Sequence, residues 1–169
     1  LVIIISGHIK RGDYVELESG EKGYVSDITW KNTVIRAIPN NMIIVPNSKL
    51  SSTILTNYYQ PQKDILVRID VGVGYESDLK KVEKVTVEVA KEVMQEVKGG
   101  VPSFEPYLRY HTFSDFSINF TVMLCADEYF DQYLVKHEFI KRLHERYGRQ
   151  GIVIPFPIRT VQMMKEGVH

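Results

Sequence analysis

Few residues of this 169-residue chain have the types and the spacing that catalysis or metal binding requires. His137 and Glu138 are followed by His144, so the two histidines stand seven positions apart, whereas the HExxH zinc motif places them four apart. A solvated, charged helix face is the better interpretation of these residues. The carboxylates between residues 127 and 131 favour a helix start, where negative charge is stabilised, over a metal site.

Gly72 and Gly74 follow a predicted strand and precede a predicted helix, an arrangement loosely similar to phosphate-binding loops. The third glycine and the GK[ST] ending of such loops are missing, so a close turn into a capped helix is the simpler interpretation. His111 and Cys125 stand alone in predicted strands, where a packing role is expected. We therefore predict no catalytic residue, no metal ion and no cofactor, and we expect that the protein is not an enzyme.

The composition is that of a folded chain with balanced charge. Lysine plus arginine equals aspartate plus glutamate, 21 each, and 44% of the residues are apolar. This apolar content is enough for a packed core, and the length suits one or two small domains. A chain without net charge is a poor candidate for wrapping nucleic acid or coating an anionic membrane. A single cysteine provides neither a disulfide framework nor a thiolate zinc site.

The first five residues form a very apolar run that is much shorter than the ~20 residues that a membrane-spanning helix needs. The pattern leaves two interpretations open, the first strand of a soluble domain or the end of a membrane helix whose remainder is absent. Lys10 and Arg11 follow this run, and cationic residues flank membrane segments on the cytoplasmic side.

Residues 12–58 predict a small β domain, because short alternating segments are separated by turn-forming residues. At its last corner, Pro46 lacks an N–H and should end strand pairing. Asn47 and Ser48 suit a tight turn held by bonds to nearby backbone groups, and Ser48 could cap a short helical turn through Leu50. Five short strands suggest an open barrel of the SH3-like or Sm-like kind. The predicted strands are residues 14–18, 24–28, 33–38, 42–45 and 53–58.

The rest of the chain predicts an α/β-sandwich, which makes the whole an α+β protein. After a hinge at residues 60–62, the order strand, helix, strand, strand, helix, strand is the split βαβ pattern of ferredoxin-like domains. Ser77 is the expected N-cap of the first helix, and Gly99 with Gly100 should end it. The predicted elements are strand 65–73, helix 78–98, strands 107–113 and 116–124, helix 129–147 and strand 158–165. The second helix should bury a face made of Tyr133, the stem of Lys136, Ile140, Leu143 and Tyr147, with Phe139 beside it.

Six short motifs, in order along nearly the whole chain, resemble the cytoplasmic part of the small-conductance mechanosensitive channel family (MscS-like). The most recognisable is VPNS at 45–48, which is similar to the family's [IV]-P-N-[SAG]. The others are GDYV at 12–15, GYVSDI at 23–28 with TVIR at 33–36, ILTNY at 54–58, VGVGYESD at 71–78 and GIVIPFP at 151–157. A departure lies at His8 and Ile9, where the family often has a proline–phenylalanine pair. The structural motif residues that the resemblance singles out are Pro46, Asn47, Ser48, Gly72, Gly74, Pro155 and Pro157.

The resemblance implies a homo-heptamer in the cell membrane, with this part of the protein on the cytoplasmic side. Residues 1–9 would end a pore-lining helix, residues 10–60 would form an Sm-like ring, residues 61–157 a ferredoxin-like vestibule wall, and residues 158–169 a strand of a barrel at the base. The implied function is opening under membrane tension, which releases ions and small solutes on osmotic shock. The gate and the other membrane helices would lie ahead of Leu1. The partners implied are other copies of the chain, the lipid bilayer, ions and small solutes, and no nucleic acid. We expect Asn57, Gln60 and Lys63 at the rim of side portals.

The alternative is an RNA-binding module, because Sm-like and ferredoxin-like domains are both common in RNA-binding proteins. Trp30, Tyr58 and Tyr59 could stack on bases, but basic residues do not cluster to hold phosphates.

Overall fold

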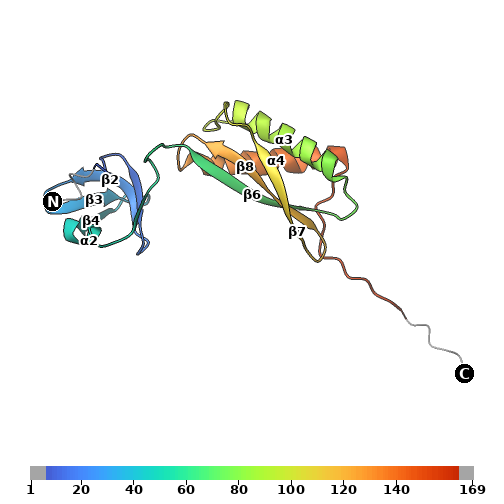
Figure 1. The fold of residues 1–169 in the computed structure, drawn as a ribbon, viewed down its shortest axis with the longest axis horizontal. Coiled ribbons are helices and arrows are strands. Elements are labelled where there is room, and N and C mark those ends of the chain that lie inside the picture. Colours follow the sequence, from blue (N-terminus) through green and yellow to red (C-terminus); the bar gives the residue numbers. More distant parts are fainter. Residues whose placement is uncertain (1–6, 164–169) are drawn as a thin grey trace, which may run out of the picture.

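The computed structural model describes residues 7–163, which form a mixed α+β chain with two antiparallel sheets. Each sheet has its own hydrophobic cluster, one around Val15, Val25 and Ile35 and the other around Val67, Phe120 and Phe139. Figure 1 shows the five-stranded sheet at one end of the long axis, and the three-stranded sheet with two helices at the other. We call these parts the β unit and the α/β unit.

The β unit is built from five short strands in the spatial order β4-β3-β2-β1-β5. Alternate residues are buried in β3 and in the first half of β2, as the period-two pattern predicts, whereas β1 buries both Tyr14 and Val15. Every neighbouring pair of strands is antiparallel. Gly23 must lack a side chain, because a Cβ there would lie 2.7 Å from the Arg36 carbonyl carbon on the facing strand. The strands are β1 (Tyr14–Leu17), β2 (Lys22–Ile28), β3 (Asn32–Arg36), β4 (Met42–Pro46) and β5 (Leu55–Asn57), the last shorter than predicted.

The α/β unit places its three strands in the order β6-β8-β7. β8 is antiparallel to both neighbours, so β6 and β7 run parallel to each other and a helix connects them. Both helices cover the same face of the sheet, with α4 against β6 and β8, and α3 against β7 and β8 (Figure 1). The elements are β6 (Ile65–Val73), α3 (Leu79–Glu96), β7 (Tyr107–Phe113), β8 (Ile118–Ala126) and α4 (Asp131–Gln150).

The first helix buries a row of valines, and its cap differs from the predicted one. Asp78, and not Ser77, is the N-cap of α3, because its carboxylate accepts bonds from the backbone N–H groups of Lys80 and Lys81. The Ser77 N–H instead donates to the Gly74 carbonyl at 3.1 Å, which places Ser77 in the preceding turn. The valines that face the core are Val82, Val85, Val89, Val93 and Val97.

The buried face of the second helix differs from the predicted one. Tyr133 and Ile140 are 57% and 51% exposed, and Lys136 also faces solvent. The helix packs through a single row of residues four apart, and the predicted face mixed neighbouring rows. Its C-cap is Gly151 in the left-handed region, whereas Gly148 lies within the helix. The buried row is Val135, Phe139, Leu143 and Tyr147.

The predicted final strand at 158–165 is not formed in residues 158–163, and residues 164 and 165 lie outside the described range. The Val153 carbonyl accepts a bond from the Gly74 N–H at 3.0 Å, beside the end of β6. Alternate residues of an extended segment face the same side, so Pro155 and Pro157 would be next to face β6. Neither proline has an N–H to donate, which explains why the tail leaves the sheet instead of adding a fourth strand (Figure 1).

Candidate functional site

The most distinctive site in the described residues is a cluster of aromatic rings where the β unit meets the α/β unit. Tyr14 of β1 stacks on Tyr129, with centroids 4.5 Å apart and planes at 27°, and Tyr58 lies 4.5 Å from the same ring. Phe130 approaches Tyr14 edge-on at 4.9 Å. Offset and edge-on ring pairs at these distances are favourable beyond simple burial. We define the aromatic joint as Tyr14, Tyr24, Tyr58, Tyr59, Tyr129, Phe130 and Tyr133.

Two tyrosine hydroxyls tie the aromatic joint to carboxylates. The Tyr58 hydroxyl donates to Glu16 of β1 at 2.8 Å, and the Tyr59 hydroxyl donates to Glu128 in the loop before α4. Burial, then the bond to Glu16, raises the pKa of Tyr58 to about 12. Burial and the bond to Glu128 likewise raise the pKa of Tyr59 far above its ordinary value. Both hydroxyls therefore keep their protons and act as donors at neutral pH.

The three residues predicted for a portal rim lie at the end of β5 and in the linker that runs past this joint to β6. Asn57 is half-buried, and its amide nitrogen donates to the His8 carbonyl and the Asp13 carboxylate, each at 2.8 Å. Lys63 is exposed, with its ammonium 4.8 Å from the centre of the Tyr59 ring. Gln60 lies between them and is half-buried, and its peptide bond to the next residue is cis. Asn57 therefore ends the five-stranded sheet, and Gln60 and Lys63 lie in the segment that joins the two sheets.

The corner at residues 46–50 holds a distant loop rather than only its own turn, which corrects the expectation for Asn47 and Ser48. The buried Asn47 amide accepts from the Thr33 hydroxyl and donates to the Thr29 carbonyl, each at 2.8 Å. The N-cap of the short helix α2 (Asn47–Leu50) is Pro46, without a side-chain bond, so Ser48 is not the cap. Pro46 ends β4, as its missing N–H predicts.

The glycines of the 71–78 motif serve packing. A Cβ on Gly72 would lie 2.8 Å from the Asn119 side-chain oxygen, and the Gly74 N–H holds the chain after α4. The predicted packing role of Cys125 is consistent with its burial, which raises the pKa of its thiol. These positions therefore contribute to packing within the α/β unit.

A polar network lies on the face of the three-stranded sheet that the helices do not cover, and the sequence pattern did not predict it. The Thr121 hydroxyl donates to Asp70 at 2.6 Å and lies 3.1 Å from the His111 ring nitrogen Nε2. These residues come from β8, β6 and β7, and only the strand register brings them together. Among residues 7–163, no three His, Cys, Asp or Glu side chains are grouped so that they could hold a metal ion.

The RNA-binding alternative loses two of its three stacking candidates. Tyr58 and Tyr59 pack within the aromatic joint, so their rings are not free platforms for bases. Trp30, the third candidate, is exposed. None of the helices in residues 7–163 combines the length and the apolar character needed to cross a bilayer.

Family models match both units in order. The β-domain of the mechanosensitive ion channel matches residues 1–60, and the C-terminal domain of the mechanosensitive ion channel MscS matches residues 67–154. An uncharacterised MscS family protein of Archaeoglobus fulgidus is 29% identical over 98% of this chain and 56% of its own length. The small-conductance mechanosensitive channel MscMJ of Methanocaldococcus jannaschii is 28% identical over 98% of this chain and 47% of its own length. The chain thus spans about half the length of these curated relatives.

A solved structure shares the fold. The crystal structure of Helicobacter pylori MscS in its closed state gives a TM-score of 0.79 at 24% identity, over 98% of this chain and 63% of that one. At this identity the likeness concerns the fold, and the family follows from the matching family models. The chain belongs to the MscS family of mechanosensitive ion channels.

Proposed function

We propose that this chain forms the cytoplasmic vestibule of a channel in the cell membrane that opens under membrane tension. In this proposal the β unit is an Sm-like ring module below the pore, and the α/β unit is a ferredoxin-like wall module. Seven copies enclose the vestibule, residues 1–9 end the pore-lining helix, and residues 158–169 contribute to a barrel at its base. Ions and small solutes pass through side portals whose rims include Asn57, Gln60 and Lys63.

The observation that carries the proposal is that both family domains follow each other in one chain and meet through the aromatic joint. A vestibule must hold its ring and its wall in register while solutes pass between subunits. Stacked rings and the hydrogen bond from Tyr59 to Glu128 support such a connection, and the bond from Tyr58 to Glu16 holds one of the rings against β1. The exposed ammonium of Lys63 on this linker suits a weak electrostatic filter.

A channel chimera tests this function. The region of Helicobacter pylori MscS that aligns with this chain is replaced by the chain and expressed in bacteria that lack their own mechanosensitive channels. We expect the chimera to rescue survival of hypo-osmotic shock, because the donor supplies the membrane helices and this chain supplies the vestibule. A chimera that inserts into the membrane but does not rescue survival of the shock would contradict the proposal.

A further inference from the structure

We propose that the tip of the β2–β3 hairpin, residues 28–32, is a membrane anchor in which Trp30 enters the headgroup region of an anionic bilayer. Lys31, beside it, would pair with lipid phosphates. This inference rests on the proposed function, because it needs the β unit to lie directly below a membrane. It adds a lipid-binding site that neither the family match nor the predicted motifs assign.

Trp30 is exposed to an unusual degree. It is the only tryptophan of the chain, and 77% of its surface is open to solvent. Tryptophan is on average strongly buried in folded proteins, so a ring this exposed is informative. Its apolar body and its N–H donor suit the boundary between hydrocarbon and water, where tryptophan is enriched in membrane proteins.

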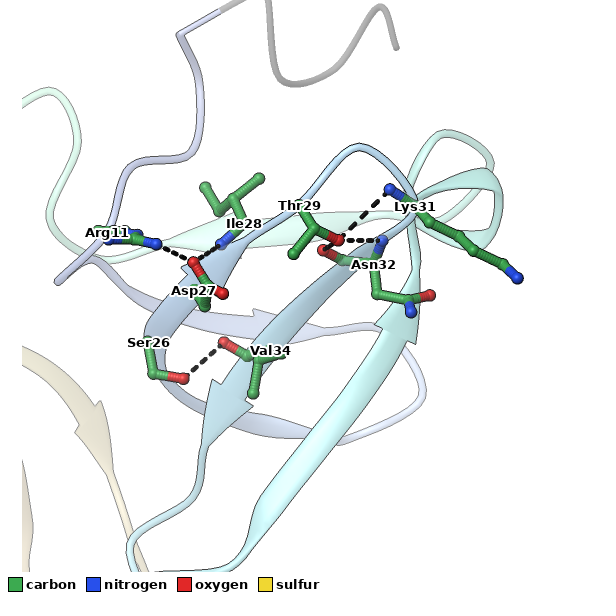
Figure 2. A network of polar contacts seen from close by, with 8 residues as sticks. All are labelled: Arg11, Ser26, Asp27, Ile28, Thr29, Lys31, Asn32 and Val34. Carbon is green, nitrogen blue, oxygen red and sulfur yellow. Dashed lines mark hydrogen bonds and ion pairs between the residues drawn. The ribbon is translucent and has the colours of Figure 1, made fainter.

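The loop that carries Trp30 is held firmly on both sides. The Thr29 hydroxyl accepts bonds from the Asn32 N–H at 3.0 Å and the Lys31 N–H at 3.4 Å (Figure 2). From α2, Asn47 donates to the Thr29 carbonyl at 2.8 Å and to the Lys31 carbonyl at 2.9 Å. The most recognisable motif residue thus fixes the backbone around Trp30. A preorganised loop lowers the entropy cost of placing the ring in a binding site.

The charge around the tip favours a lipid surface. Residues 28–32 contain Lys31 and no carboxylate, and the nearest acid in sequence, Asp27, pairs with Arg11 (Figure 2). The Lys31 side chain extends outward from the loop (Figure 2). Basic residues near an anionic bilayer gain attraction that falls off within a Debye length, so the zero net charge of the whole chain does not oppose it.

The position of the tip agrees with this assignment. The Arg11–Asp27 pair places the segment after residue 7 beside the start of the hairpin loop. In the proposed channel this segment descends from the pore-lining helix, so the loop lies at the membrane end of the β unit. A neighbouring copy is the competing occupant, but lysine is depleted at the centre of protein interfaces. The flanking Lys31 therefore favours lipid.

The fluorescence of Trp30 tests the anchor directly, because no other tryptophan contributes. The chain is tethered to vesicles through an N-terminal histidine tag and a chelating lipid, with brominated acyl chains as quenchers. In vesicles that contain phosphatidylserine we expect a blue-shifted emission that the brominated lipid quenches. A matched sample tethered through a C-terminal tag should keep the emission wavelength of a tryptophan that is exposed to water. Unchanged, unquenched emission from the N-terminal tether would overturn the anchor.

Variants separate lipid binding from other causes. Lys31→Gln should weaken insertion about fivefold, as loss of one basic contact to an anionic surface implies. Lys84→Gln, an equal charge change on the exposed side of α3, should have no effect. Equal effects of both variants, or a blue shift that appears on raising the protein concentration without vesicles, would overturn the proposal. If the chimera rescues survival of osmotic shock while Trp30 stays exposed to water, the anchor is refuted and the channel function stands. If the chimera does not rescue survival, the proposed channel function is contradicted.

Discussion

Asn47 shows how one side chain can organise a motif. Its amide bonds to Thr33 and Thr29, and its backbone N–H bonds to Lys31, so one buried residue connects the end of β4 with the β2–β3 loop. The sequence identified Asn47 as important but assigned it to its own turn. Turn-forming residue types indicate local bonds, and long-range bonds depend on strand pairing that a local pattern does not contain.

Replacement of Asn47 should therefore be costly for stability. Asn47→Ala leaves the Thr33 hydroxyl and the Thr29 carbonyl without this partner, and an unsatisfied buried group costs about 1–3 kcal/mol. We expect a loss of that size in the free energy of unfolding, measured by urea titration. Ser48→Ala, at an exposed neighbour, should change it by less than about 0.5 kcal/mol. Equal effects of the two substitutions would contradict the role of Asn47.

The tyrosines of the aromatic joint predict a loss of stability in alkali. The pKa of Tyr58 rises from 10.0 to about 12, chiefly through burial and then through its bond to Glu16. Between these pH values the folded state keeps the proton while the unfolded state loses it. The contribution of Tyr58 to the free energy of unfolding is therefore fully present below pH 10 and is lost as the pH rises toward 12. Urea midpoints measured across this range should fall less steeply in Tyr58→Phe. Glu16→Gln should also flatten the curve, and identical slopes in all three proteins would contradict this role of the joint.

At the scale of elements, most strands and both long helices could be predicted from periodicity. The alternating apolar residues of β6 and the valines spaced three and four apart in α3 could be predicted, because each pattern depends only on neighbours in sequence. The buried face of α4 could not be predicted, because it depends on packing against the sheet. The absence of the final strand could not be predicted either, because it depends on which side the prolines face. The aromatic joint was also missed, because Tyr14 and Tyr129 are far apart in the chain.

The prolines after α4 should control whether the sheet gains a strand. The double variant Pro155→Ala and Pro157→Ala restores two N–H donors on the side that continues from the Val153–Gly74 bond. We expect the tail to pair with β6 and the β6 amides to gain protection in hydrogen exchange. Pro102→Ala, in a turn elsewhere, should leave β6 unchanged. Unaltered exchange in the double variant would show that something other than the prolines keeps the tail away.

At the scale of the whole molecule, the aromatic joint makes the two units parts of one assembly. Two sheets with separate cores could move independently, yet rings from both units contact one another and a hydrogen bond from Tyr59 to Glu128 crosses between them. In the proposed channel this connection transmits the position of the ring to the vestibule wall. The linker past the joint is then free to form the portal rim.

The portal proposal makes Lys63 a determinant of ion selectivity. Lys63→Glu reverses the charge on the linker, so the chimeric channel should shift its reversal potential toward cation preference under a salt gradient. Lys84→Glu makes the same charge change on α3, away from the linker, and should leave the reversal potential unchanged. A channel that keeps its ion preference after Lys63→Glu would remove Lys63 from the rim.

The most direct test of the central claim is a patch-clamp recording of the chimera that carries this chain below the Helicobacter pylori membrane helices. Suction applied to excised patches should open discrete currents whose open probability rises with tension, because the chain completes a working vestibule. Patches in which the chimera is present and assembled, but remains silent up to membrane rupture, would contradict the account.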